Sequence, residues 1–318
     1  MSEERIPLLE VENLEVTFVR KKRGRRVVTR AVDRNSFTIY KGETFGLVGE
    51  SGCGKTTTGR AIIRLYNPNG GTVRLNGRDI SGKMTRDLRG YLNENITMIF
   101  QDPVDSLNPR MTVREIIEEG LEVRGMKDAR KREEMVYEML EKVGLTREHA
   151  TRYPHEFSGG QRQRIGIARA LIVEPSLIIA DEPVSALDVS IQAQVINLLN
   201  QLKQEMDLTI MFVAHDLSVV KYFSDRIAVM YAGKIVEIAD SAELYRYPLH
   251  PYTKSLLSAV PRPNPATERK RRRISYDPKC HDYSVEKPRM QEIAPDHWVY
   301  CSDSEFVAYQ EEYSAQEK

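Results

Sequence analysis

Residues 44–57 read TFGLVGESGCGKTT, a short apolar run that leads directly into a glycine-rich loop. The loop fits the pattern G-x-x-x-x-G-K-[ST], and a helical stretch at 57–65 follows it. A strand, a glycine-rich turn and a helix start gather backbone N–H groups around one centre, where they bind phosphate oxygens. The residues that we expect to bind the nucleotide here are Gly49, Glu50, Ser51, Gly52, Cys53, Gly54, Lys55, Thr56 and Thr57.

Two side chains of this phosphate loop carry predicted chemistry. Lys55 is expected to reach the β- and γ-phosphates, and Thr56 is expected to offer its hydroxyl oxygen to Mg²⁺. For Cys53 we favour inert packing over a redox role. The alternative for the whole stretch, a glycine-rich turn without chemistry, is disfavoured because both the strand and the helix are in place.

A second strand, residues 177–180 (LIIA), ends in two carboxylates, Asp181 and Glu182. Adjacent strand residues point to opposite faces, so the two side chains serve different positions. Asp181 is expected to support the Mg²⁺ shell, and Glu182 is expected to polarise an attacking water. This arrangement predicts nucleotide hydrolysis, whereas the alternative is a pair of solvated charges at a strand end.

The composition limits the class of protein. The chain has 318 residues, of which 41% are hydrophobic, and its formal net charge is +1. These values exclude a collagenous or wholly disordered chain and provide no global field toward nucleic acid or acidic lipid. Three scattered cysteines favour a reducing compartment, with the cytosol as the default. No apolar run approaches the roughly 18 residues that span a bilayer, so we expect no membrane crossing.

Strand and helix patterns alternate along most of the chain. Strands are predicted at 8–18, 44–48, 96–100, 177–180, 209–214 and 226–230, and helices at 113–121, 135–143, 162–171 and 190–205. This alternation is typical of an α/β fold with a largely parallel sheet covered on both faces. The basic stretch Arg20–Arg26 is interpreted as a solvated hairpin loop, in preference to a phosphate-binding segment. Residues 261–273 are predicted to be a linker.

The stretch FSGGQ at 157–161 resembles the LSGGQ signature of ABC ATPases, with Phe in the first place. Other motifs of that family follow in its order: Phe18, the phosphate loop, Gln101, the Asp181–Glu182 pair, SALD at 185–188 and His215. The resemblance covers about residues 8–260. It implies a phosphate-loop (RecA-like) ABC nucleotide-binding domain over 1–260, with an N-terminal antiparallel β region, a helical subdomain at about 102–165 and a small C-terminal tail at 261–318. ATP and Mg²⁺ are the implied cofactors.

The signature itself is suited to binding an anion. Ser158 is a good N-cap for the helix that follows, and Gly159 and Gly160 leave backbone N–H groups open at the helix start. In the resembled family the signature, here Ser158 to Gln161, binds the γ-phosphate held by the opposing ATPase domain. Because this chain carries one phosphate loop and one signature, the working unit is expected to be a homo- or heterodimer.

The resemblance also implies roles for further residues. Phe18 would stack on adenine, which is worth about 1 to 3 kcal/mol, although Phe18 as plain core is the alternative. Gln101 would contact Mg²⁺ or the attacking water, and His215 would contact the γ-phosphate. Asp188 would contact the partner's phosphate loop. The implied catalytic residues are Glu182, His215, Gln101 and Lys55, and the implied metal-binding residues are Thr56, Gln101 and Asp181.

Flanking sequence narrows the resemblance to the ATPases of bacterial oligopeptide and dipeptide importers, most closely their F-type ATP-binding subunits. The stretches that carry it are 98–113, 152–171, 180–199 and 250–263 (HPYTKSLLSAVPRP). The implied partners are a D-type ATPase subunit, two membrane permeases and, indirectly, an extracellular peptide-binding protein. The implied location is the cytoplasmic face of the cell membrane. Coupling to the permease would run near Gln101 and the segment Asp102–Arg110.

Several alternatives stay open at this point. Related ATPases serve dipeptide or nickel importers. A soluble ABC ATPase acting on nucleic acid or ribosomes would use the basic runs Arg20–Arg26 and Arg269–Arg273, although no nucleic acid partner is expected. A regulatory half that does not hydrolyse ATP is disfavoured, because the chain keeps Lys55, Asp181, Glu182 and His215.

The tail departs from many relatives, in which four clustered cysteines hold an iron–sulfur cluster. Here the tail has only Cys280 and Cys301, so no such cluster is expected. Zinc held by these cysteines with His281 and His297 is disfavoured, because Cys280 and His281 are adjacent and make poor tetrahedral geometry. A docking role for the tail is favoured.

Overall fold

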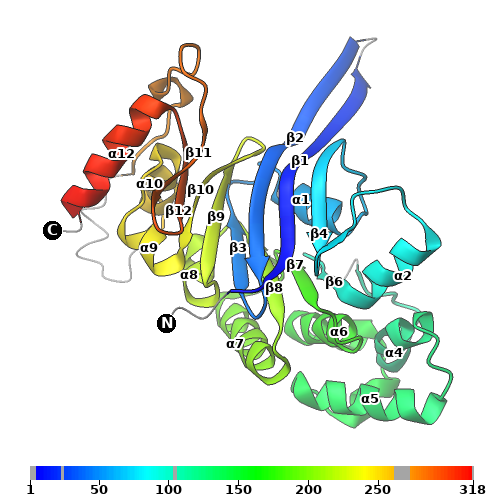
Figure 1. Cartoon of the computed structure of the whole chain (residues 1–318). Coiled ribbons are helices and arrows are strands. Elements are labelled where there is room, and N and C mark those ends of the chain that lie inside the picture. The colour runs from blue at the N-terminus through cyan, green and yellow to red at the C-terminus, as the bar shows by residue number, and fades with distance from the viewer. Residues whose placement is uncertain (1–4, 23–24, 103–105, 261–272, 317–318) are drawn as a thin grey trace.

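The structure is a computed structural model that describes residues 5–22, 25–102, 106–260 and 273–316 (Figure 1). Within these residues the larger sheet has the strand order β11-β12-β10-β9-β3-β8-β7-β6. Its strands are β3 (Thr44–Val48), β6 (Ile96–Ile99), β7 (Leu177–Asp181), β8 (Thr209–Ala214), β9 (Arg226–Tyr231), β10 (Lys234–Asp240), β11 (Arg289–Ala294) and β12 (His297–Cys301). The predicted central strands are therefore confirmed.

The strands β9, β3, β8, β7 and β6 run parallel to one another. Their apolar sequences leave β3, β7 and β8 buried along their whole length, as expected for parallel strands with both faces covered. The carboxyl ends of β3, β6, β7 and β8 consequently meet at one edge of the sheet. Ligands of open α/β sheets bind at such an edge.

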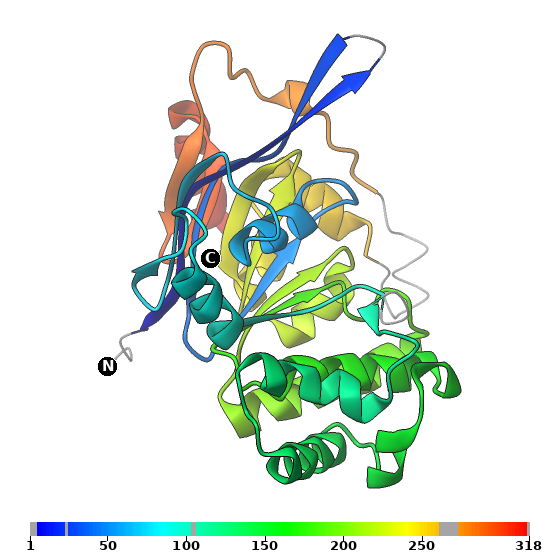
Figure 2. The ribbon, with the colours of Figure 1, turned by 90° about the vertical axis from the view of Figure 1, so that its right-hand side faces the viewer.

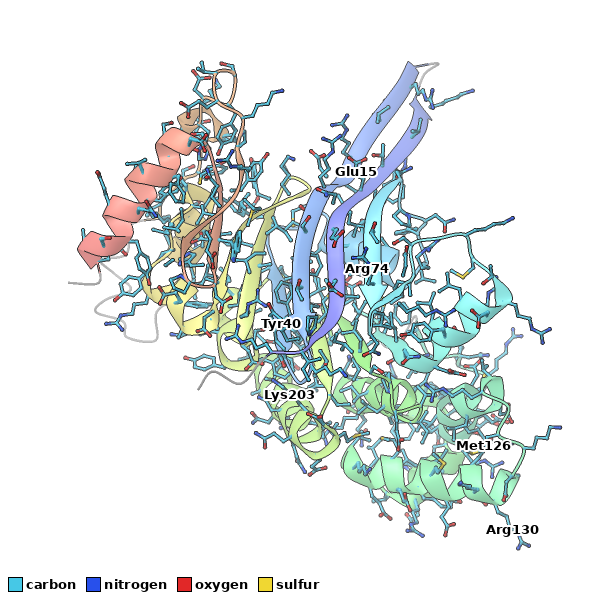
Figure 3. The ribbon with its side chains drawn as sticks, in the orientation of Figure 1. Glu15, Tyr40, Arg74, Met126, Arg130 and Lys203 are labelled. Atoms are coloured by element: carbon cyan, nitrogen blue, oxygen red, sulfur yellow. The ribbon has the colours of Figure 1, made fainter. Side chains whose placement is uncertain are left out.

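A smaller antiparallel sheet has the order β2-β1-β4-β5. Its strands are β1 (Pro7–Lys22), β2 (Arg25–Tyr40), β4 (Gly70–Leu75) and β5 (Arg78–Asp79), and Figure 3 shows Glu15 and Arg74 on neighbouring strands of it. This sheet confirms the expected N-terminal antiparallel β region. Figures 1 and 2 show β1 and β2 projecting past the body as a two-stranded arm.

The hairpin-loop prediction for Arg20–Arg26 is wrong for most of that stretch. The pairs Lys21↔Arg26 and Lys22↔Arg25 continue the antiparallel ladder through it, and only residues 23 and 24 lie outside the described residues. Backbone pairing persists because a ribbon that projects into solvent can carry charged side chains without burying them. Charge alone was therefore a poor indicator of a loop.

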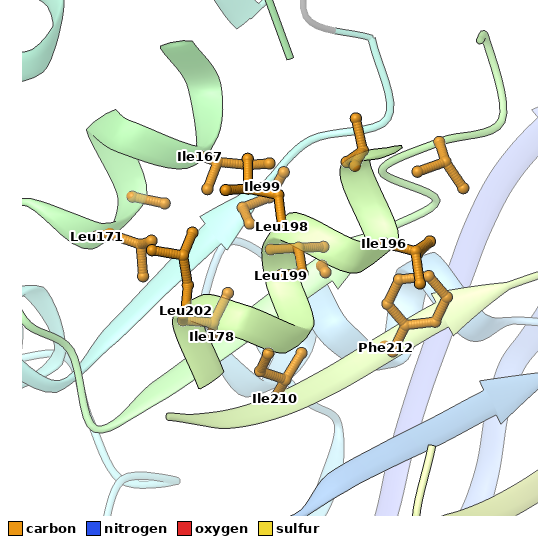
Figure 4. Packing of buried hydrophobic residues seen from close by; sticks show 14 of the residues in the cluster. Ile99, Ile167, Leu171, Ile178, Ile196, Leu198, Leu199, Leu202, Ile210 and Phe212 are labelled. Carbon is orange, nitrogen blue, oxygen red and sulfur yellow. The ribbon is translucent and has the colours of Figure 1, made fainter. Parts of the chain in front are cut away.

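Each face of the larger sheet carries its own core. On one face helix α1 (Lys55–Ile62) lies between the two sheets, and its Ala61 and Ile62 pack with Leu47 and Val11. On the other face α6 (Gly159–Leu171), α7 (Val189–Met206) and α8 (Leu217–Phe223) cover the strands. Figure 4 shows Ile167 and Leu199 of these helices in one cluster with Ile178 and Ile210 of the strands.

A helical lobe interrupts the α/β order, as predicted (Figure 2). After α2 (Arg86–Asn95) and β6 it comprises α4 (Val113–Val123), α5 (Ala129–Lys142), the 3-10 turns Arg147–Thr151 and Pro154–Glu156, and α6. The side chain of Thr112 and that of Glu115 cap the start of α4 reciprocally, which fixes where this helix begins. Residues 103–105 of the predicted coupling segment lie outside the described residues.

The C-terminal segment joins the larger sheet. After α9 (Ser241–Arg246) and α10 (Pro251–Ser258), strand β12 pairs with β10 through Glu237↔Val299 and Ile238↔Trp298, and β11 pairs with β12. Helix α12 (Asp303–Gln316) packs on β11. All of the predicted linker except Arg273 lies outside the described residues. No described helix combines the length and apolar character needed to cross a bilayer.

Candidate active site

The phosphate loop connects β3 to α1 at the carboxyl edge of the sheet. Gly54 has φ +114°, and a Cβ there would lie 2.1 Å from the carbonyl oxygen of Ala31. Gly49 has φ +153°, and a Cβ there would lie 2.2 Å from the carbonyl oxygen of Met230. Both positions therefore require glycine. Gly54 caps α1 without a side-chain hydrogen bond, so the first N–H groups of the helix remain open to an anion.

Lys55 closes the loop from inside. Its side chain is 3% exposed, and Nζ donates hydrogen bonds to the carbonyl oxygens of Gly49 (2.9 Å) and Glu50 (3.1 Å). The same nitrogen lies 3.9 Å from Oε1 of Glu182. The ammonium group is thus held between the loop and the carboxylate that follows β7.

The predicted metal ligands Thr56 and Asp181 meet directly. Thr56 Oγ1 donates to Asp181 Oδ1 at 2.8 Å, and Oδ2 of this fully buried carboxylate has no hydrogen-bond partner among the described residues. Arg60 Nη2 lies 3.9 Å from Oδ2. Burial raises the pKa of Asp181, because the charged form is desolvated. A carboxylate oxygen without a hydrogen bond, beside a hydroxyl, is a donor set that suits Mg²⁺, so these residues fit the implied ion.

Glu182 is the centre of the predicted catalytic cluster. Its oxygen Oε2 accepts a hydrogen bond from Gln101 Nε2 (3.2 Å) and lies 3.0 Å from His215 Nδ1. Gln101 follows β6 and His215 follows β8, so three strand ends bring the three side chains together. The backbone of Glu182 is left-handed, with φ +46°, and its N–H donates to the carbonyl oxygen of Val213 at 2.9 Å. Such backbone strain clusters at functional sites.

Phe18 lies on β1 at the base of the arm. Its half-buried ring is 5.3 Å from the ring of Tyr66, in an edge-to-face arrangement. Sequence reasoning missed Tyr66, although it is an aromatic residue only a few positions after the helix that starts at Lys55. The two rings form one aromatic edge that remains half accessible.

The signature residues lie on a different element, at the start of α6. Ser158 Oγ accepts from the N–H of Gln161 (3.4 Å), and Gln161 Oε1 accepts from the N–H of Ser158 (3.0 Å). Ser158, Gly160 and Gln161 line a cavity of about 360 Å³. Asp188 begins α7, is exposed and makes no side-chain cap bond. Within the described residues no hydrogen bond or ion pair joins these groups to the phosphate loop.

The four residues considered for zinc are not assembled as one site. His281 Nδ1 lies 2.5 Å from Glu305, and His297 Nε2 lies 2.8 Å from Glu237. Cys301 is buried, whereas Cys280 is exposed. No group of three or more His, Cys, Asp or Glu side chains in the described part of the chain is arranged to hold a metal ion.

Comparisons with known proteins agree with this geometry. A family model described as "ABC transporter" matches residues 32–185. An oligopeptide transport ATP-binding protein, OppF of Bacillus subtilis, is 58% identical over 95% of this chain and 98% of its own length. The chain belongs to the ABC transporter ATPases. It is therefore an ATPase whose phosphate loop lies in an ATP-binding fold, and the predicted fold class and enzyme class are confirmed.

Other matches extend the comparison. A model described as "Oligopeptide/dipeptide transporter, C-terminal region" matches residues 236–284, which include α9 and α10. The dipeptide transport ATP-binding protein DppF of Lactococcus lactis is 52% identical over 95% of this chain and 96% of its own length. Among solved structures, a dimeric post-hydrolysis state of the ATP-binding cassette MJ0796 bound to ADP and Pi has a TM-score of 0.66 at 28% identity, and covers 74% of this chain and 99% of that chain.

Proposed function

We propose that this ABC ATPase powers a bacterial importer of oligopeptides by hydrolysing ATP between two ATPase subunits. The cargo is supported by the names of the relatives, among them oligopeptide transport proteins 58% and 54% identical to this chain. The hydrolysis is supported by one observation above all, which is the placement of Glu182 between Gln101, His215 and Lys55. Dipeptides are a second candidate cargo, because DppF is 52% identical.

Each residue of the cluster has a proposed role in the chemistry. Lys55 exchanges its bonds to loop carbonyls for bonds to the β- and γ-phosphate oxygens. Glu182 accepts a proton from the attacking water, while Gln101 orients that water and His215 holds the carboxylate and contacts the γ-phosphate. Mg²⁺, when bound by Thr56, Gln101 and Asp181, would neutralise charge that develops on the phosphates. Phe18 stacks on the adenine.

The remaining contacts to the nucleotide come from a second ATPase subunit. Within the described part of the chain, Ser158 to Gln161 and Asp188 have no bond to their own phosphate loop, and the cap of α6 leaves the N–H groups of Gly159 and Gly160 open. They therefore serve the nucleotide on the partner, in our proposal a D-type ATPase. Two permease subunits and, indirectly, an extracellular peptide-binding protein complete the importer. This places the chain at the cytoplasmic face of the membrane, with Gln101 and the residues after it as the coupling region.

The test separates binding from hydrolysis. Glu182→Gln should bind ATP as tightly as the parent and lose at least about a hundredfold in hydrolysis rate, because only the proton acceptor is removed. Lys55→Ala should lose ATP affinity itself. Glu12→Gln, an exposed carboxylate paired with Arg74, is the control and should change neither quantity. Unchanged turnover of Glu182→Gln would remove Glu182 from the chemistry, and unchanged affinity of Lys55→Ala would refute the nucleotide site.

A further inference from the structure

Helix α10 reaches the phosphate loop from outside it. The hydroxyl oxygen of Tyr252 accepts a hydrogen bond from the backbone N–H of Glu50 at 3.1 Å, across 202 residues of sequence. The Tyr252 side chain is buried, with 2% exposure. On the other side of the same residue, the Glu50 carbonyl oxygen accepts from Lys55 Nζ. Glu50 is therefore held on both of its backbone polar groups, one by the loop's own lysine and one by a distant tyrosine.

Aromatic rings fix the position of Tyr252. Its ring centroid lies 4.5 Å from that of Tyr231, at the end of β9, and 5.5 Å from that of Tyr276, in the C-terminal segment. Tyr276 also meets Tyr231 edge-on at 5.0 Å, so the three rings form a closed cluster. Ring pairs at these separations add packing energy beyond area burial. One of the three members belongs to the segment that follows the predicted linker.

A histidine caps the start of α10. His250 Nδ1 accepts from the N–H of Tyr252 at 3.1 Å and so caps the helix. Burial, together with the neighbouring His281, lowers the pKa of His250 to about 3, so its ring is neutral and can accept this bond at neutral pH. The His281 ring stacks on the His250 ring at 5.1 Å, and His281 itself is held by Glu305.

A buried carboxylate ties the same segment to the sheet. Glu237 of β10 is fully buried and accepts hydrogen bonds from the N–H groups of Leu249 (2.8 Å) and His250 (3.1 Å). His297 Nε2, on β12, lies 2.8 Å from the same carboxylate. Contacts therefore run without a break from the C-terminal strands and Tyr276, through the start of α10, to the backbone of the phosphate loop.

We propose that Tyr252 is a positioning residue for ATP binding, and that the C-terminal segment sets ATP affinity through it. This inference rests on the proposed role of the phosphate loop as the ATP site. Tyr252 does not contact the nucleotide. It keeps one peptide unit of the loop in place before the phosphates arrive, and preorganisation of this kind lowers the cost of binding.

Tyr252→Phe removes only the hydroxyl group and is the direct test. The expected result is a Kd and a KM for ATP raised about fivefold, the effect of one neutral hydrogen bond, while kcat at saturating ATP stays near the parent value. The catalytic cluster around Glu182 is left intact. Tyr91→Phe is the matched control, because the hydroxyl of Tyr91, on α2, donates to the carbonyl oxygen of Leu75, on β4, at 2.9 Å. That variant should keep the KM of the parent.

Tyr276→Leu tests the link to the C-terminal segment in the full-length chain. It removes the ring that packs on Tyr252 without touching the loop, so it should also raise KM, and it should add little when combined with Tyr252→Phe because both act through one bond. This variant also carries the test should Tyr252→Phe fail to fold.

The outcomes distinguish the two proposals. Parental KM values in both Tyr252→Phe and Tyr276→Leu would overturn the positioning role, and so would a fall in kcat with unchanged KM. If Lys55→Ala retains full ATP affinity, the nucleotide site itself is wrong, whatever Tyr252→Phe does. If Lys55→Ala loses affinity while both tyrosine variants behave like the parent, the nucleotide site stands, and both the positioning role of Tyr252 and the influence of the C-terminal segment are refuted.

Discussion

The charged side chains of the site cluster where the phosphate loop meets β7. Lys55 and Asp181 are almost fully buried, and Glu182 adopts a left-handed backbone conformation. Burial of the Asp181 carboxylate, whose Oδ2 has no hydrogen bond among the described residues and only the Arg60 guanidinium at 3.9 Å, costs the fold free energy, and so does the backbone strain at Glu182. Such features persist because they prepare the site for phosphate and for a cation. Substitutions that remove these features should therefore increase the free energy of unfolding.

Asp181→Asn tests directly whether the buried charge destabilises the protein in the absence of nucleotide and Mg²⁺. The amide oxygen can still accept from Thr56, while the desolvated charge is gone, so the midpoint of thermal unfolding without nucleotide and Mg²⁺ should rise by about 2 °C. Addition of Mg·ATP should then raise the midpoint of the parent but hardly that of the variant. Calorimetry with and without EDTA measures both shifts. A lower midpoint for the metal-free variant would contradict the destabilising role of the charge.

The lowered pKa of His250 predicts how the stability of the protein depends on pH. Its pKa is about 3 in the folded protein and ordinarily near 6.5, so the unfolded chain binds the extra proton as the pH falls between these values. The free energy of unfolding should thus be fully retained above pH 7 and should fall by about 2 kcal/mol by pH 5 through this residue. His250→Asn keeps a cap acceptor and should remove that part of the dependence. Urea unfolding of parent and variant at pH 7.5 and at pH 5 measures the two losses of stability. Equal losses in the two proteins would show that His250 is not the source of the pH dependence.

At the level of elements, the start of α6 lies against α7. A Cβ on Gly160 would lie 2.6 Å from Cγ2 of Ile191, whereas a Cβ on Gly159 would meet Cδ2 of Leu187 at an ordinary 3.5 Å. Ile191 is β-branched and stiff at χ1, so its side chain cannot easily move away from an added Cβ. The two signature glycines therefore differ, since Gly160 also spaces the two helices.

Gly160→Ala should destabilise the protein by about 1 kcal/mol relative to Gly159→Ala, because overpacking adds to one variant and not to the other. Both substitutions change helix propensity alike, which makes Gly159→Ala the matched control. Denaturant unfolding of the two variants gives the difference. Equal stabilities would show that the helices do not touch through Gly160.

Sequence patterns predicted the elements unevenly. The strands that end at Val48, Asp181 and Ala214 were predicted because buried parallel strands are short, apolar and followed by polar turns. The arm was misread because a solvent-exposed ribbon tolerates charges that resemble a loop. Strands β11 and β12 were not predicted, because their alternation is weak and β10, with which β12 pairs, lies more than 50 residues earlier.

At the level of the whole molecule, one edge of the sheet assembles residues from four separate strand ends. Motif order was sufficient to bring Lys55, Gln101, Glu182 and His215 together, because carboxyl ends of parallel strands share an edge. Motif order could not predict that Tyr252 holds the loop, since a single tyrosine carries no spacing signal and its contact spans 202 residues. Among the described residues no hydrogen bond or ion pair joins the signature to this edge, which is why we propose a second subunit.

The most direct measurement is the mass of the complex that binds ATP. Glu182→Gln protein is mixed with the ATPase subunit that copurifies with it, and its mass is followed by light scattering with and without Mg·ATP. We expect ATP to join two ATPase chains into one particle. Ser158→Arg should block this association at the partner's nucleotide without weakening ATP binding at this chain's own loop. ATP that saturates the loop while every chain stays monomeric in the intact Glu182→Gln pair would contradict it.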